Sequence, residues 1–416
     1  MKTITQLFHA SPAPVLALLL AFAWLNTAAA ESTGSSTLDK APDPSEGEVR
    51  LAATNGWEAF LILDNKGVPL WTVEPADVFD SHGCPEVVGL DDKGRAHVCV
   101  SYSGRWTPTT VISDPKWLGG FAHEDVDPRL PGSETYVGAQ SGNLYQVVAW
   151  PNLVLDYRLI ASLPGREIHT LAAGQLDPAT PEREVLAFTV PGGVYVASPT
   201  GANGGFQWKH LGDYVGRVRQ ALLLPRTGEG PPCVVTASRN GRLDLLEVAG
   251  GQLKWRTIFE TEMGMGRVAL RPPSPGQPLT LYSTLDDGRI LRHERQSETN
   301  WTAEVIYHGP QGPRGVAAGQ FDADAEIETI VIFGYGKKVE LLSRRAEGWQ
   351  AETIFEDEEK GHWIATAELD GRNQTREVVV TGYGGRIYYL ARPPGYGRKE
   401  LCAPAMAQGK AGVTNR

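Results

Sequence analysis

One spacing recurs along this chain: an aromatic residue that opens a strand-like segment is followed about 20 positions later by an aspartate. The pairs are Trp71 and Asp91, Trp106 and Asp127, Tyr157 and Asp177, Trp301 and Asp322, and Trp349 and Asp370. Trp208 and Trp255 keep the rhythm without the acid. Successive aromatics lie roughly 50 residues apart, except for the shorter first interval. A strand-built repeat of about 40–50 residues is typical of the blades of a β-propeller.

The clearest repeat predicts four antiparallel strands. Residues 315–321 alternate small and apolar side chains, as expected for a strand near a crowded central axis. The run 329–333 is almost wholly apolar, which is typical of a strand buried on both faces. A Gly-Tyr-Gly turn leads into residues 337–342, and Trp349 opens the fourth strand. Glycine-containing turns at the corresponding places of other repeats favour tight hairpins.

The predicted fold is all-β: a seven-bladed β-propeller of four-stranded antiparallel blades. The last repeat, residues 362–393, supplies only three strands. We expect residues 68–73 to complete that blade, so that strands from both ends of the chain close the ring and remove its open edge. The segments 49–54 and 57–64 are surplus in this count, and eight blades are the alternative.

The two ends of the chain have their own composition. Residues 1–30 predict a signal peptide with an apolar stretch and a small-residue cleavage site, and residues 31–46 predict a disordered leader. The propeller is expected over 47–392, followed by a tail at 393–416. After cleavage no long apolar run remains, so we expect a secreted or periplasmic monomer without a membrane anchor.

Net charge and cysteine content narrow the function classes. The formal net charge is −10 and the pI is about 5.5, which argues against a nucleic-acid partner because phosphate binding needs a basic footprint. Disulfides are common in an oxidising compartment. Cys84 and Cys99 flank a turn, so they either pair across a hairpin or stay free, and the sequence leaves the pairing of Cys233 and Cys402 open.

Four segments carry a resemblance to a known family: residues 87–104, 172–188, 317–336 and 365–384. Each segment starts with small residues, such as Ala-Ala-Gly, and continues with an acidic turn. An apolar run then follows a glutamate or another polar residue, and a glycine-containing turn comes next. This pattern resembles degenerate FG-GAP/VCBS repeats, which form integrin-α-type β-propellers. The resemblance implies the propeller fold and is compatible with adhesion, carbohydrate binding, scaffolding, or lyase and dehydratase chemistry.

The resemblance also raises the question of calcium, because loops of this family often carry oxygen ligands at every second position. The acids of one loop keep that spacing: Asp322, Asp324, Glu326 and Glu328. The loop lacks the glycine of the family pattern. The alternative is that these acids cap turns and bind no ion, in which case the protein uses no cofactor.

A polar residue precedes the first strand of each predicted repeat. In chain order these residues are His82, His123, His169, Arg217, Arg267, Arg314 and His362. They are predicted to surround one mouth of the central channel, where blades converge and leave a concavity. Histidine and arginine together suit an anionic ligand. The alternative is that they bind loop carbonyls and fill the mouth.

Two functions are compatible with these residues. The first is an exported, non-catalytic protein that binds a carbohydrate or protein ligand at the central funnel; it is favoured because no Walker, HExxH or GxSxG motif is present. The alternative is a carbohydrate-active enzyme, a polysaccharide lyase or sugar dehydratase, that uses the funnel histidines and arginines. Tyr335 and Tyr383 lie in Gly-Tyr-Gly turns and are interpreted as rim or turn residues rather than proton donors.

Overall fold

The structure is a computed structural model of the chain. It describes residues 50–79, 84–102, 105–150, 154–180, 182–201, 205–225, 232–309 and 312–397. The predicted signal peptide and leader lie outside these ranges, as do His82, Cys402 and most of the predicted tail. None of the residues that the structure describes forms a helix long and apolar enough to cross a membrane.

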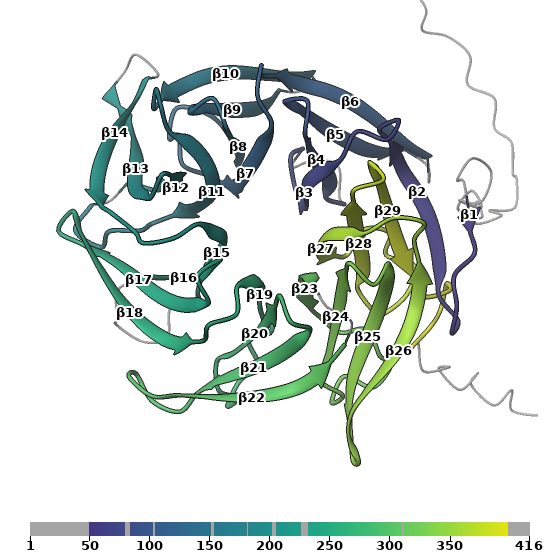
Figure 1. The fold of residues 1–416 in the computed structure, drawn as a ribbon. Coiled ribbons are helices and arrows are strands. Elements are labelled where there is room, and N and C mark those ends of the chain that lie inside the picture. Colours follow the sequence, from purple (N-terminus) through teal and green to yellow (C-terminus); the bar gives the residue numbers. More distant parts are fainter. Residues whose placement is uncertain are drawn as a thin grey trace, which may run out of the picture. The chain divides into compact units, whose positions relative to one another are not determined.

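The described part of the chain is all-β and forms seven sheets arranged in a ring (Figure 1). Blade 1 consists of β3 (Leu70–Ala76), β4 (Glu86–Asp91), β5 (Arg95–Tyr102) and β6 (Arg105–Ser113). Blade 2 consists of β7 (Leu118–Glu124), β8 (Glu134–Ala139), β9 (Asn143–Trp150) and β10 (Val154–Ser162). Blade 3 consists of β11 (Glu167–Gly174), β12 (Glu184–Val190), β13 (Gly193–Thr200) and β14 (Gly205–Gly212).

The next three blades have the same antiparallel order. Blade 4 consists of β15 (Val218–Leu223), β16 (Cys233–Ser238), β17 (Arg242–Ala249) and β18 (Gln252–Glu260). Blade 5 consists of β19 (Met265–Leu270), β20 (Thr280–Leu285), β21 (Arg289–Arg295) and β22 (Trp301–His308). Blade 6 consists of β23 (Pro313–Ala318), β24 (Thr329–Gly334), β25 (Lys338–Arg345) and β26 (Gly348–Glu356).

Blade 7 joins the two ends of the chain and settles the blade count at seven. Its sheet contains β27 (Gly361–Ala367), β28 (Glu377–Gly382) and β29 (Arg386–Ala391), followed by β2 (Glu58–Asp64) and β1 (Arg50–Leu51). The predicted closure by an N-terminal strand is therefore confirmed, but the predicted strand is wrong. Residues 57–64 close the ring, and the alternative of eight blades is wrong because this surplus segment has its place in blade 7.

The error in the predicted closing strand has a physical explanation. Trp71 resembles the aromatic openers of the fourth strands, yet it lies in the innermost strand β3. The ring of Phe60 in β2 instead stacks on Tyr389 of β29, with centroids 4.7 Å apart. Burial of this pair on the apolar face of blade 7 makes β2 the closing strand. The short interval between Trp71 and Trp106 follows, since the two residues belong to the first and last strands of one blade.

The core lies between neighbouring blades. The second strand of each blade is sandwiched between the adjacent sheets, and in β4, β8, β24 and β28 every residue is buried. This explains why these segments read as continuous apolar runs rather than as alternating patterns. Blades also approach closely where a side chain is missing: a Cβ on Gly138 of β8 would lie 2.3 Å from a methyl of Ile168 in blade 3.

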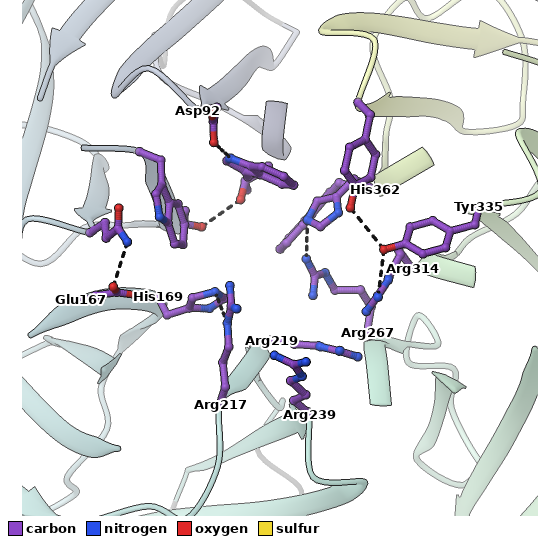
Figure 2. Close-up of a pocket in the computed structure, with 17 residues that line it drawn as sticks. Asp92, Glu167, His169, Arg217, Arg219, Arg239, Arg267, Arg314, Tyr335 and His362 are labelled. Atoms are coloured by element: carbon purple, nitrogen blue, oxygen red, sulfur yellow. Dashed lines mark hydrogen bonds between the residues drawn. The ribbon is translucent and has the colours of Figure 1, made fainter. Parts of the chain in front are cut away.

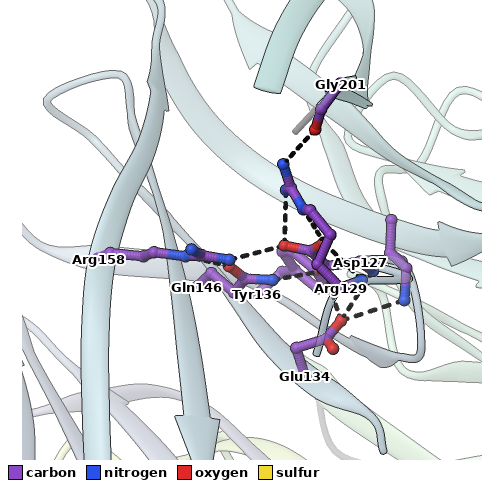
Figure 3. Close-up of polar contacts among 8 residues, drawn as sticks. Asp127, Arg129, Glu134, Tyr136, Gln146, Arg158 and Gly201 are labelled. Carbon is purple, nitrogen blue, oxygen red and sulfur yellow. Dashed lines mark hydrogen bonds and ion pairs between the residues drawn. The ribbon is translucent and has the colours of Figure 1, made fainter. Parts of the chain in front are cut away.

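The recurring aspartate of blade 2, Asp127, has a structural role, as Figure 3 shows. Asp127 is fully buried and pairs with Arg129 at 2.5 Å and with Arg158 of the outermost strand β10 at 2.6 Å. One carboxylate oxygen of Glu134 accepts hydrogen bonds from the backbone N–H groups of Val126 and Asp127. These contacts tie the loop between β7 and β8 to the outer edge of blade 2, which gives Asp127 a structural role.

The described cysteines form no disulfide in the structure. Cys84 and Cys99 are both free thiols, as is Cys233, so the hairpin disulfide is not formed. Cys99 is fully buried in the apolar core between blades 7 and 1, and in β5 it is paired in register with Val87 of β4. Burial raises the pKa of the Cys99 thiol to about 12, so this thiol remains protonated and unreactive.

Substitution of Phe60 by alanine tests the closure. We expect Phe60→Ala to lower the free energy of unfolding by about 3–5 kcal/mol, because the change removes a buried ring and leaves a cavity beside Tyr389. Urea denaturation followed by tryptophan fluorescence measures the loss. Val68→Ala, in the half-buried turn before β3, is the control and should cost much less. Equal effects of the two substitutions would contradict closure by β2.

Candidate functional site

The innermost strand of every blade contains a register irregularity near its start. In each case at least one residue of the first strand has no residue opposite it in the second strand, which is the signature of a β-bulge. The unpaired residues, from blade 1 to blade 7, are Trp71, Gly119, His169, Arg219, Arg267 (with Gly266), Arg314 and His362. A bulge turns a side chain out of the regular alternation, and here it turns one toward the central axis in every blade except blade 2, where the unpaired residue is a glycine.

These seven residues line one cavity of about 410 Å³ at the centre of the ring (Figure 2). The deeper side chains are well shielded, since Arg267 is 5% and His169 is 9% exposed. The cavity volume falls within the range of small-molecule sites, which is about 300–1,000 Å³. The remaining lining residues are Thr72, Asp92, Trp117, Gln140, Glu167, Arg217, Arg239, Tyr335, Trp363 and Tyr383.

A second tier of cavity residues comes from the turns between the second and third strands. The backbone N–H groups of Arg239, Tyr335 and Tyr383 donate to the carbonyls of Arg217, Gly312 and Lys360, near the starts of the first strands. Antiparallel order places the start of strand one and the end of strand two at the same end of a blade. The tip of this turn therefore reaches the mouth of the cavity.

Tyr335 and Tyr383 show how this arrangement brings turn residues into the cavity. Their place in Gly-Tyr-Gly turns favours a rim position over a deep one, but the structure has both side chains lining the central cavity. Tight glycine turns make this possible. In blade 4, for example, Gly241 has a φ of 84° in the turn that carries Arg239.

The structure brings most of the predicted ligand-binding residues together. Five of them line the central cavity: His169, Arg217, Arg267, Arg314 and His362. His123 lies at the far end of β7 and lines a second cavity instead. His82 is outside the described residues. Arg219, Arg239 and the three tryptophans are not among the predicted residues; the residue directly after each apolar second strand is the signal that would have found Arg239.

The cavity has two chemically different walls. All five of its arginines come from blades 4, 5 and 6: Arg217, Arg219, Arg239, Arg267 and Arg314. Trp71, Trp117, Trp363 and Tyr383 come from blades 7, 1 and 2, and Tyr335 comes from blade 6. The arginines thus occupy one side of the cavity and most of the aromatic rings the other, and the two walls meet where Arg267 lies over Trp363 and Arg314 over Tyr335.

Positive charge exceeds negative charge on the arginine wall. Asp286 compensates Arg219 at 2.8 Å and Arg314 at 3.0 Å. The pKa of Arg217 is lowered by burial and by the charge of Arg219. The pKa of Arg267 is lowered by burial and by the charges of Arg219 and Arg314. Like charges that depress one another's pKa indicate a cluster that an anion would stabilise.

The two histidines of the cavity are neutral acceptors. Burial, with the charges of neighbouring arginines, holds the pKa of His169 and of His362 well below the usual range. The Nε of Arg217 donates to Nε2 of His169 at 2.6 Å, and Arg267 contacts Nε2 of His362 at 3.2 Å. Each histidine thus orients an arginine without adding a competing charge.

Two guanidinium groups have donors to spare. Arg217 donates to His169 through Nε, and its terminal nitrogens make no hydrogen bond to a described residue. Arg239 is exposed at the mouth and makes no side-chain hydrogen bond within the described part of the chain. The backbone N–H of Arg239 donates to the carbonyl of Arg217 at 2.9 Å, so the two side chains leave neighbouring points of blade 4.

A second cavity of about 340 Å³ lies further along the inner strands and shares Gly119 and Trp363 with the first. Glu74 lines it at this junction and accepts a hydrogen bond from Nε1 of Trp363 at 2.9 Å. The guanidinium of Arg267 lies 4.2 Å from the centre of the Trp363 ring. Burial raises the pKa of Glu74 to about 7, against the opposing effects of Trp363 and Arg267.

The four predicted calcium ligands do not converge in the structure. Asp322 pairs with Arg345 at 2.6 Å, and Asp324 accepts a hydrogen bond from the backbone of Glu326. Glu328 points inward, where Tyr282 and Arg292 donate to it. Among the described residues one group of three carboxylates lies within metal-binding distance: Glu368, Asp370 and Glu377. Calcium at residues 322–328 stays a prediction of the sequence.

Comparison with known proteins supports the fold. No family model and no curated protein matches the sequence. Among solved structures, the chain is similar to the WD40 β-propeller domain of Doa1, with a TM-score of 0.55 and 12% identity over 82% of this chain and 98% of that one. It is also similar to BBS1N in complex with ARL6DN, soaked with lead, with a TM-score of 0.55 and 11% identity over 82% and 97%. At such identities the likeness shows the propeller fold alone.

The raised pKa of Glu74 predicts a pH dependence. Between its ordinary value of 4.5 and about 7, the folded protein binds a proton that the unfolded chain releases, so stability falls as pH rises through this window. Glu74→Gln keeps an acceptor for Trp363 and removes the penalty. We expect the variant to be more stable than the parent by about 1–3 kcal/mol at pH 8 and nearly equal to it at pH 4.

Urea denaturation at the two pH values measures this difference. Glu347→Gln, at the exposed tip between β25 and β26, controls for the change in net charge. A constant offset between Glu74→Gln and the parent at both pH values would contradict a buried carboxyl that titrates near neutrality.

Proposed function

We propose that this protein binds an anionic carbohydrate, a sugar acid or sulfated sugar, in the central cavity. Binding is common to both functions that the sequence predicts, the binding module and the carbohydrate-active enzyme. The observation that carries the proposal is the division of one cavity into an arginine wall from blades 4–6 and an aromatic wall from blades 6, 7, 1 and 2.

Each wall suits one part of such a ligand. Arginine presents paired N–H donors that match a carboxylate or sulfate, and such charge-assisted hydrogen bonds are the stronger ones. Arg217 and Arg239 offer such donors beside the compensated Arg219. The opposite wall offers the faces and edges of Trp71 and Trp117, flat apolar surfaces against which a sugar ring can pack while its hydroxyls reach polar groups.

The size of the cavity favours a carbohydrate over a protein ligand. A volume of about 410 Å³ suits a small molecule or one end of an oligosaccharide, whereas a protein would need a much larger contact area. BBS1N has been solved in complex with ARL6DN, so a similar propeller binds a protein in that case. For this chain an acidic protein segment is the second candidate for the same cavity.

Two predictions of the sequence belong to this proposal. The FG-GAP/VCBS-type repeats at 87–104, 172–188, 317–336 and 365–384 resemble those of integrin-α-type propellers, and the segment 1–30 resembles a signal peptide. An exported carbohydrate-binding propeller accounts for both. The charge of the cavity is also opposite to the net charge of −10 of the whole chain, which fits a site built for a specific anion.

The choice of arginines decides how the proposal is tested. Arg267 is a poor target, because it is buried over the Trp363 ring and its loss would affect folding. Arg314 is a poor target because it is already paired with Asp286. Arg217→Ala together with Arg239→Ala removes the donors that are free for a ligand. We expect this double variant to bind oligogalacturonate at least about 100-fold more weakly, since hydrogen bonds to charged groups contribute about 1.5–3 kcal/mol each.

Isothermal titration calorimetry at low and high salt measures the effect, and the parent's affinity should fall with salt because exposed charge pairs are screened. Arg105→Ala with Lys254→Ala removes the same number of positive charges from exposed positions outside the cavity and should leave binding unchanged. Binding that survives in the Arg217 and Arg239 double variant would refute the proposed site. A parent that binds neither oligogalacturonate nor a sulfated oligosaccharide would refute the proposed ligand class.

A further inference from the structure

We propose that the central cavity also catalyses β-elimination on a bound sugar acid, with Tyr335 as the base that abstracts the proton next to the carboxylate and Tyr383 as the acid that protonates the leaving oxygen. This inference rests on the proposed function, because the sugar acid must first bind in the cavity. It adds an activity and two catalytic residues to that binding site.

The geometry of the two tyrosines carries the inference. Their hydroxyl oxygens lie 3.2 Å apart, and both side chains line the cavity (Figure 2). The Tyr335 oxygen also accepts a hydrogen bond from Arg314 at 3.0 Å, and the Arg314 guanidinium lies 4.9 Å from the centre of the Tyr335 ring. The Lys360 amine is 5.2 Å from the same ring. Positive charge therefore surrounds one of the two phenols.

The environments of the two phenols differ in the direction that acid–base chemistry needs. Against the opposing effect of burial, the hydrogen bond with Tyr383 and the charge of Arg314 lower the pKa of Tyr335. Burial and the contact with Tyr335 raise the pKa of Tyr383 to about 12. Neighbouring groups whose pKa values are pushed apart are the usual basis for assigning a base and an acid.

The step balances without a further reactant. The Tyr335 phenolate takes the proton from the carbon next to the carboxylate, and the electrons of that C–H bond form a carbon–carbon double bond. The bond from the neighbouring carbon to its oxygen substituent breaks, and the leaving oxygen takes the proton of the Tyr383 hydroxyl. The products are an unsaturated sugar acid and a free hydroxyl. Proton transfer from Tyr335 to Tyr383 across their 3.2 Å contact restores both residues.

The rest of the cavity supports this chemistry. As the proton leaves, negative charge moves onto the carboxylate of the substrate, and fixed positive charges stabilise such charge most effectively in a shielded site. Arg267 and Arg314 provide that charge beside the tyrosines, and both also lower the pKa of His362. Because its pKa is held so low, the His362 imidazole is a poor proton acceptor and does not compete with Tyr335 for the proton of the substrate.

The experiment measures binding and chemistry separately. The parent and three variants, Tyr335→Phe, Tyr383→Phe and Tyr307→Phe, are incubated with polygalacturonate, alginate and chondroitin sulfate. Ultraviolet absorbance detects the conjugated double bond of the product, and calorimetry gives the affinity for oligosaccharides of each polymer. The Tyr307 hydroxyl donates a hydrogen bond to Glu340, and Tyr307 is not among the residues that line the cavity, so its variant is the matched control.

We expect the parent and Tyr307→Phe to produce unsaturated product from at least one polymer. Tyr335→Phe and Tyr383→Phe should lose about 100-fold or more of that rate, as is typical when a general acid or base is removed, while affinity changes less than about threefold. Binding without product in the parent would overturn the inference and leave the proposed function standing. If no polymer binds, both fall.

A titration without substrate gives a second, independent outcome. Ultraviolet difference spectra follow the ionisation of tyrosine as pH rises. The parent should show one tyrosine that ionises below the ordinary value of about 10 and is absent from Tyr335→Phe. Identical titrations of the two proteins over this range would overturn the assignment of Tyr335 as the base.

Discussion

Each blade of this propeller places more residues in its innermost strand than the neighbouring strand can pair with, and the central cavity depends on that excess. A regular strand would point its side chains into the spaces between blades. The bulge breaks this alternation once per blade and, in every blade except blade 2, turns one side chain toward the axis. Six blades thus deliver six side chains to one place, and Gly119 of blade 2 leaves space beside them, while the packing between blades stays intact.

The chemistry of the cavity follows from which residues occupy the repeated positions. Blades 4, 5 and 6 place arginines there, whereas blades 1 and 2 place an aromatic or a glycine. Arginines this close destabilise one another unless negative charge approaches, and Asp286 compensates two of them only in part. Neutral histidines hold Arg217 and Arg267 in position. An anion of the right shape would complete the balance.

The sequence predicts the architecture because each blade must pack on its neighbours in the same way, which gives the chain a period. Aromatic openers of fourth strands and apolar second strands recur wherever blades must pack, so the seven blades, their four strands and the closure by an N-terminal strand could be foreseen. The identity of the closing strand could not, because Trp71 mimics an opener although it occupies a bulge. Only pairing across the whole chain, with β2 beside β29, distinguishes the two positions.

The candidate site could be foreseen in part for a related reason. Polar residues near the start of each first strand stand out against apolar neighbours, which is why the sequence points to His169, Arg267 and His362. The sequence does not predict that Arg239 and Tyr383 line the cavity, because turn residues of this kind usually face solvent. Their inward position follows from the antiparallel order, which brings the turn after strand two back to the start of strand one.

A crystal structure of the protein with bound oligogalacturonate is the most direct test of the claim that the bulges build an anion-binding cavity. We expect a sugar carboxylate within hydrogen-bonding distance of Arg217 or Arg239, with a sugar ring packed against Trp71 or Trp117. An oligosaccharide bound on the outer faces of the blades, with the central cavity free of sugar, would contradict that claim.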